Sequence, residues 1–146
     1  MSVFIKATMQ ESSSVIMAES AALALAANLL NQLQCRNTII LSDNQQLVHF
    51  LNGANLSNPP DWRIKSFTQI AANLLSATTS QVRRIKRNQN QMADSLAKQA
   101  LQALTTNQII HSSSCTNRIH RNDCPVLRAI NDITINSVMV LSGSCC

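Results

Sequence analysis

The sequence is poor in aromatic residues. They make up 3% of the 146 residues, and tyrosine is absent. Proteins that bind single strands stack bases on aromatic rings, and this chain offers few platforms for that purpose, chiefly Phe4, Phe50, Trp62 and Phe67. We therefore expect a nucleic-acid partner to be held mainly through its backbone. The apolar content of 45% is nevertheless ordinary for a single domain with a core.

Long apolar runs and paired cysteine motifs are also missing. No run approaches the roughly 20 apolar residues of a membrane span, and the start, MSVFIKATMQ, lacks the basic and then apolar layout of a secretion signal. The five cysteines are odd in number and contain no C-x-x-C pair, which argues against a disulfide framework. We expect an intracellular chain with reduced thiols and no membrane partner.

The chain carries a net positive charge, and many of its basic residues are concentrated in one short segment. The net charge is +5, and four of the twelve basic residues fall within five positions, at Arg83, Arg84, Lys86 and Arg87. This local density favours a polyanion as partner. The alternative is a basic turn that is merely solvated.

Strand and helix patterns alternate along the chain, which predicts an α/β domain. Alternating apolar residues, β-branched runs and helical spacing mark the elements. Strands are predicted over 2–10, 37–43 and 80–86, and helices over 17–34, 43–53, 61–75 and 92–104. Asp43 and Asp61 are aspartates, a residue type favoured at helix N-caps, and Gly53 is predicted to end the helix that begins near residue 43. The apolar face of the last helix is predicted to consist of Met92, Ala93, Leu96, Ala97, Ala100 and Leu104.

The region 105–146 differs in character from the domain predicted over 1–104. It is polar and rich in serine and asparagine, so we expect a poorly ordered tail with one possible strand within 132–143. His111, Cys115, His120 and Cys124 have spacings close to those of a zinc knuckle. The spacing differs from the usual one, and the expected glycine and aromatic residue are absent. We expect scattered tail residues rather than a zinc site.

Three of the seven acids occupy positions that suit a metal site. Glu19 borders the apolar stripe of the first helix, Asp43 follows a buried strand, and Asp94 lies beside the apolar face of the last helix. Each has an ordinary alternative, namely a first-turn Glu, an N-cap and a solvated surface Asp. Together, carboxylates from two helices and one strand end can meet at a sheet edge, where Mg²⁺ prefers oxygen ligands.

Three motifs in order resemble the ribonuclease H-like domains of plant proteins related to retroelement reverse transcriptases. They are AESAALALAANLL, LSDNQQLVHFLNG and RRIKRNQNQMADSLAKQA, and the resemblance covers about residues 2–104. It implies an α/β fold with a mixed sheet and flanking helices, and cleavage of the RNA strand of RNA/DNA hybrids by two Mg²⁺ ions, with Mn²⁺ as a substitute. By motif, Glu19, Asp43 and Asp94 are similar to the second, third and fourth of four metal-binding, catalytic acids. Asn90 is similar to the asparagine that orders the loop before the last helix, and Arg87 to an arginine common in the plant subgroup.

Two departures from the family pattern shape the expectation. Arg84 stands where many relatives carry a histidine used in proton transfer or product release. The family's first two strands, with the acid that bridges both metals, should precede residue 2, so we expect them to be lacking. We therefore predict negligible hybrid cleavage by this chain alone. Three interpretations stay open: an impaired ribonuclease H-like domain, a silent nucleic-acid-binding module and a non-functional relic of a mobile element.

Overall fold

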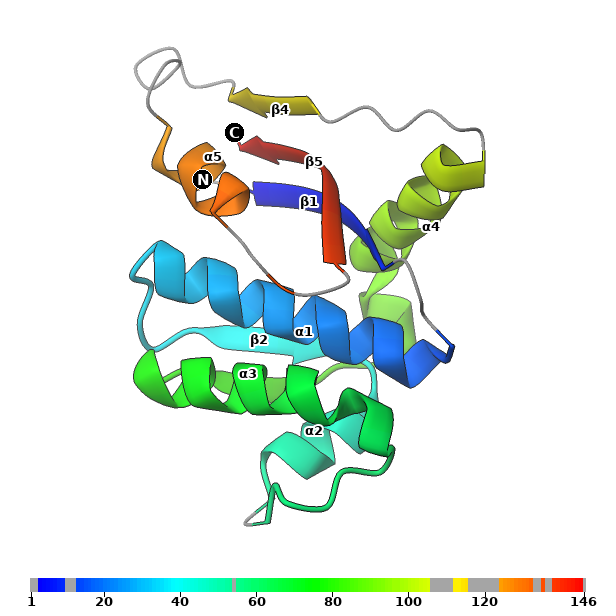
Figure 1. Cartoon of the computed structure of the whole chain (residues 1–146), viewed down its shortest axis with the longest axis vertical. Helices are drawn as coiled ribbons and strands as arrows, with labels where there is room; N and C mark the ends of the chain where they lie inside the picture. The colour runs from blue at the N-terminus through cyan, green and yellow to red at the C-terminus, as the bar shows by residue number, and fades with distance from the viewer. Residues whose placement is uncertain are drawn as a thin grey trace. The chain divides into compact units, whose positions relative to one another are not determined.

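Helices and strands alternate along the chain as predicted, so the α/β fold class is confirmed (Figure 1). The computed structural model describes residues 3–9, 13–53, 55–105, 112–115, 124–132, 135 and 138–145. The chain divides into two compact units. One is the continuous stretch Glu11–Asn90, and the other combines Met1–Gln10 with Gln91–Cys146.

The unit of residues 11–90 is built on a two-stranded parallel sheet. Strands β2 and β3 pair in register from Ile39↔Gln81 to Ser42↔Arg84. The elements, in chain order, are α1 (Val15–Gln32), β2 (Ile39–Ser42), α2 (Gln45–Leu51), the short 3₁₀ turn η1 (Trp62–Ile64), α3 (Lys65–Ala77), β3 (Gln81–Arg84) and a second 3₁₀ turn η2 (Arg87–Gln89).

The core of this unit lies between the two long helices and one face of the sheet. Helices α1 and α3 lie side by side (Figure 1). The alanines of α1 favour the helix by propensity and leave room for close packing. The buried cluster consists of Leu23, Ala27, Val48, Ala71, Leu75 and Val82, with Ile40, Leu51 and Leu74 packed against it.

Helix α1 is the most apolar helix of the unit. Against the expectation that no run is apolar enough, α1 could cross a membrane by length and composition alone, and 33% of that window is buried inside the structure. Its buried residues, which include Leu23 and Ala27, belong to the core described above. A core helix of this kind meets the same length and composition criterion, so the criterion by itself does not indicate a membrane.

The C-terminal ends of α1 and α3 meet the beginnings of β2 and β3. The backbone N–H of Asn37 donates to the carbonyl of Thr78 at 3.0 Å, and the hydroxyls of Thr38 and Ser80 are 2.6 Å apart. Each helix therefore runs back along the sheet, opposite in direction to the strand that follows it. The N-terminal ends of both helices consequently point toward the end at which β2 and β3 finish.

The second unit contains a three-stranded mixed sheet in the order β1-β5-β4. Strand β1 pairs antiparallel with β5 from Val3↔Cys145 to Met9↔Val138, and β4 pairs parallel with β5. The elements are β1 (Val3–Met9), α4 (Gln91–Thr105), β4 (Ser112–Cys115), α5 (Pro125–Asn131) and β5 (Val138–Cys145). In β5, Gly143 faces Ile130 of α5, and a Cβ added to this glycine would lie 2.7 Å from Ile130 Cδ1.

The region predicted to be a polar tail thus contributes β4, α5 and β5 to this unit. The possible strand near its end is β5, and its partner β1 could not be identified from the sequence. The boundary at residue 104 stays a prediction. Of the four zinc-type residues in this region, His111 and His120 lie outside the described residues.

The apolar face predicted for the last helix is only partly correct. The helix itself forms, as α4, and Ala100 is buried. In contrast, Met92 is 66% exposed, and Ala93 and Ala97 are exposed as well. Helical spacing identifies the side of a helix that is able to pack, but the extent of packing depends on tertiary neighbours.

Candidate nucleic-acid interface

Asp43 lies immediately after β2 and does not cap the helix that follows. The N-cap of α2 is Asn44, whose Oδ1 accepts a hydrogen bond from the backbone N–H of Leu47 at 3.0 Å. Ser42 Oγ accepts from the backbone N–H of Asn44 at 3.2 Å. The ordinary alternative for Asp43 is therefore wrong, and its carboxylate is available for other contacts. Asn and Asp are equally good N-caps, so the sequence alone could not choose between these neighbours.

The carboxylate of Asp43 is held by the segment that follows β3. Asn90 Nδ2 donates to Asp43 Oδ1 at 2.9 Å, and Arg87 Nε lies 3.9 Å from Asp43 Oδ2. The Asp43 side chain is 21% exposed, whereas that of Arg87 is 90% exposed. The resemblance implied that Asn90 orders this loop; the bond to Asp43 is a contact through which it can do so, and the role itself stays a prediction. Spacing alone contained no signal for this contact.

Backbone hydrogen bonds fix the same segment. The N–H of Ile85 donates to the carbonyl of Ser42 at 3.0 Å, which extends the pairing of β2 and β3 by one step. The N–H of Lys86 donates to Gln89 Oε1 at 3.2 Å, and this contact closes the turn η2. The segment between β3 and residue 90 is therefore a defined turn, attached to the end of β2 at two points.

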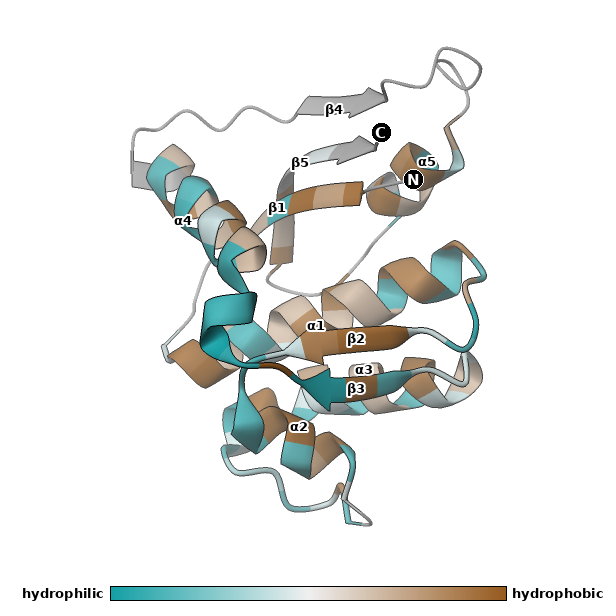
Figure 2. Ribbon diagram, turned by 180° about the vertical axis from the view of Figure 1, so that it is seen from behind, coloured by the Kyte–Doolittle hydropathy of each residue, from teal (hydrophilic) through white to brown (hydrophobic). Residues whose placement is uncertain are grey.

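The predicted basic residues all lie on this end of β3 and the turn after it. Arg83, Arg84, Lys86 and Arg87 are exposed. Arg87 has the long contact to Asp43, and Arg83 Nη2 donates weakly to Gln81 Oε1 at 3.4 Å. Among the described residues, Arg83, Arg84 and Lys86 have no carboxylate partner. Figure 2 shows the end of β3 and the turn after it mainly in hydrophilic colours, interrupted by one short apolar segment, whereas the neighbouring β2 is apolar.

Glu19 lies in the second turn of α1 and is half-buried. Its Oε2 atom is buried and has no hydrogen-bond partner among the described residues. A buried carboxylate oxygen is costly to leave without a proton donor or a cation. The position at the border of the apolar stripe, which the sequence predicted, therefore has the character expected of an oxygen that meets a ligand.

Asp94 lies in the first turn of α4, in the other unit. Its side chain is 52% exposed, and its Oδ2 accepts from Lys98 Nζ at 2.7 Å, one helical turn away. An exposed carboxylate in the first turn also favours the helix N-terminus. The local structure of Asp94 thus matches its ordinary alternative, and its predicted role in a metal site stays a prediction.

The three acids supply the oxygen donors that Mg²⁺ prefers. Within the part of the chain that the structure describes, however, no three His, Cys, Asp or Glu side chains gather closely enough to hold a metal ion. Both oxygens of Asp43 already have nitrogen neighbours, and Oδ2 of Asp94 has Lys98. Asp94 belongs to a different unit from Glu19 and Asp43, so a joint metal site of the three acids stays a prediction, and no chemical step is assigned to a metal.

Comparison with known proteins gives one match. The model of a family described as reverse transcriptase-like matches residues 1–100, which include all three predicted acids and the whole basic segment. No curated protein matches the chain.

Proposed function

The chain belongs to the reverse transcriptase-like family, a family of ribonuclease H-like domains, and on that premise we propose that it binds nucleic acid through the end of β3 and the turn after it. The preferred ligand is the backbone of an RNA/DNA hybrid. The observation that carries the proposal is the row of exposed cations at Arg83, Arg84 and Lys86, which have no carboxylate partner among the described residues.

Cations fixed on a defined turn are suited to phosphate contacts. Each phosphate that they neutralise releases condensed counterions, which is the main source of backbone affinity. The Asn90–Asp43 bond and the Ile85–Ser42 bond keep the turn attached to the sheet, so less conformational entropy is lost when a backbone binds. Backbone recognition also fits the low aromatic content of the chain.

We further propose that this chain alone does not cleave the hybrid at a significant rate. Support comes from the Asp43 carboxylate, because both of its oxygens already have nitrogen neighbours, in Asn90 and Arg87. The unpartnered Glu19 oxygen is the observation that favours the contrary view, in which Mg²⁺ or Mn²⁺ binds near it. The test therefore measures both the binding of the hybrid and the cleavage of its RNA strand.

The experiment uses a labelled RNA/DNA hybrid, with duplex DNA and duplex RNA of the same sequence for comparison. Binding is followed by fluorescence anisotropy, and cleavage by gel electrophoresis in Mg²⁺ or Mn²⁺. We expect salt-sensitive binding that is strongest for the hybrid, with no RNA product. The variant Arg84→Ala/Arg87→Ala should bind at least tenfold more weakly, whereas Arg36→Ala, an exposed arginine before β2, should not. Equal losses in both variants would contradict the proposed interface, and robust cleavage abolished by Asp43→Asn would overturn the proposed inactivity.

A further inference from the structure

Trp62 is the one aromatic side chain that the structure leaves open to solvent. It is the single tryptophan of the sequence and is 81% exposed. Phe67 is buried in the core, and Phe4 and Phe50 are half-buried. Of the four rings that were candidates for base stacking, only Trp62 therefore presents its face to a ligand. An exposed indole offers a large, flat apolar surface that a base can cover.

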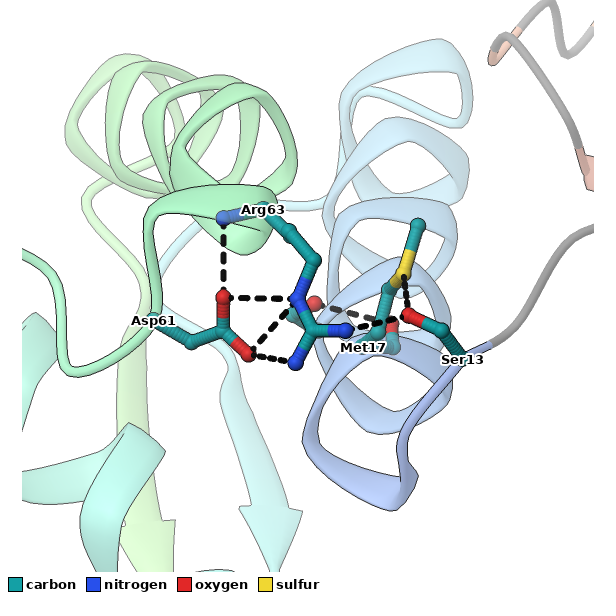
Figure 3. A network of polar contacts seen from close by, with 5 residues as sticks. Ser13, Met17, Asp61 and Arg63 are labelled. Atoms are coloured by element: carbon teal, nitrogen blue, oxygen red, sulfur yellow. Dashed lines mark hydrogen bonds and ion pairs between the residues drawn. The ribbon is translucent and has the colours of Figure 1, made fainter.

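A polar network fixes the turn that carries Trp62 (Figure 3). Asp61 caps η1, and its Oδ1 accepts from the backbone N–H of Arg63 at 3.0 Å. The guanidinium of Arg63 donates to both oxygens of Asp61, with Nη2 2.6 Å from Oδ2, and its Nη1 donates to Ser13 Oγ at 2.6 Å. The residues on both sides of Trp62 are thus held, and η1 is attached to the start of α1. The backbone that carries the indole is therefore fixed by these contacts. We call this turn, residues 61–63, the Trp62 platform.

The platform lies toward the same end of the unit as the proposed interface. Helix α3 runs back along the sheet, so its start lies toward the end at which β2 and β3 finish (Figure 1). The turn η1, which contains Trp62, directly precedes this start in the sequence. Lys65, the first residue of α3, adds an exposed cation three residues after Trp62. The basic turn after β3 and the turn that carries the aromatic ring therefore belong to the same end of the unit.

We propose that Trp62 stacks on an unpaired base of the nucleic acid that the basic turn holds. This inference rests on the proposed function and specifies its ligand as a hybrid or duplex with a single-stranded extension. Within a duplex each internal base is covered on both sides by its neighbours, so an exposed indole cannot stack on it. A base released from pairing has a free face, and an indole stacks on any of the bases.

The single tryptophan makes the test direct, because the intrinsic fluorescence of the full chain reports Trp62 alone. Two probes are compared, a blunt RNA/DNA hybrid and the same hybrid with a short run of unpaired thymidines. The extension should quench the fluorescence and the blunt probe should not.

By anisotropy, Trp62→Ala should lower affinity for the extended probe about 5- to 100-fold, with little effect on the blunt one. Trp62→Phe should retain most of the affinity. Leu101→Ala, which removes an exposed apolar side chain from α4, is the matched control and should change neither.

The outcomes separate this inference from the proposed function. If the extension neither quenches Trp62 nor tightens binding, while binding still depends on Arg84 and Arg87, the stacking inference is wrong and the interface stands. Equal quenching by both probes would also refute it, because the indole would then contact the duplex. If no probe binds at all, both proposals fail. A fluorescence shift with phosphatidylserine vesicles but with no nucleic acid would assign the exposed indole to a membrane surface instead. Circular dichroism of Trp62→Ala confirms that the variant is folded.

Discussion

Asn90 and Asp43 are 47 residues apart in the sequence, yet the amide of one donates to the carboxylate of the other at 2.9 Å. The bond ties the turn after β3 to the end of β2. The exposed cations lie on the turn that ends at Asn90, so this bond holds the segment that carries them.

Removal of this bond should destabilise the unit of residues 11–90 modestly. Asn90→Ala leaves a partly buried carboxylate oxygen without its amide donor, and we expect a loss of about 1–2 kcal/mol in the free energy of unfolding. Urea denaturation followed by circular dichroism measures it. Asn88→Ala is the matched control, because Asn88 is exposed on the same turn and its side chain makes no hydrogen bond among the described residues. Equal effects of the two substitutions would show that the bond contributes nothing.

The salt dependence of binding should report phosphate contacts one residue at a time. Lys86→Ala removes one exposed cation, and the slope of log affinity against log salt concentration for duplex probes should fall by about 0.9 if Lys86 neutralises one phosphate. Anisotropy titrations over a series of salt concentrations give the slope. An unchanged slope, with Arg36→Ala as reference, would place Lys86 outside the interface.

Acid should weaken the platform beneath Trp62. The Arg63 side chain and backbone N–H hold the pKa of Asp61 below its usual range. A carboxyl group whose pKa is lowered by folding contributes stability at a pH above its unfolded value of about 3.9, and this contribution is lost as the pH falls through the folded value. Asp61→Asn keeps a good N-cap but removes the ion pair. It should lower the urea midpoint at neutral pH and have little effect well below the carboxyl range.

Arg63→Gln is the reciprocal variant for this acid dependence. It removes the ion pair but leaves Asp61 accepting from the backbone N–H of residue 63, so it should lose only part of the pH-dependent stability that Asp61→Asn loses. A difference from the wild type that is constant across the whole pH range, for either variant, would contradict the assignment of the effect to this pair.

A methyl group added at Gly143 should destabilise the contact between β5 and α5. In Gly143→Ala the new Cβ would meet Ile130 Cδ1 at 2.7 Å. Because this atom ends a flexible side chain that can shift, we expect a cost near the lower end of the about 1–3 kcal/mol typical of overpacking. Ile130→Val deletes the obstructing methyl group and alone should cost about 0.5–1.5 kcal/mol. The double variant should be more stable than the sum of the two single effects predicts. Strict additivity in thermal unfolding would show that the two residues do not conflict.

The sequence predicted local features well because their causes are local. Alternation along Val3–Met9 identified β1, and alanine-rich helical spacing identified α1, with an observed start at Val15 and not near residue 17. The pairing of β1 with β5 was not predictable, because it joins segments from opposite ends of the sequence and no local signal selects the partner.

In the candidate site, too, the sequence predicted local features but not the contacts between distant residues. The sequence identified Asp43, Asn90 and the basic run by type and spacing, and the structure brings Asp43, Arg87 and Asn90 together. It could not assign the N-cap of α2 to Asn44, nor anticipate the network of Arg63 with Asp61 and Ser13, because these depend on side-chain geometry. The exposure of Trp62 was likewise decided by packing and not by residue type.

The division of the chain into units has a consequence for synthesis. Every contact within residues 11–90 becomes available as soon as that continuous stretch has left the ribosome, whereas β1 waits for β5, which begins at Val138. At typical elongation rates this delay is on the order of ten seconds. Throughout that interval an early strand with alternating apolar residues has no partner in its sheet. During the same interval the basic turn and the Trp62 platform, which belong to the continuous stretch, can already form.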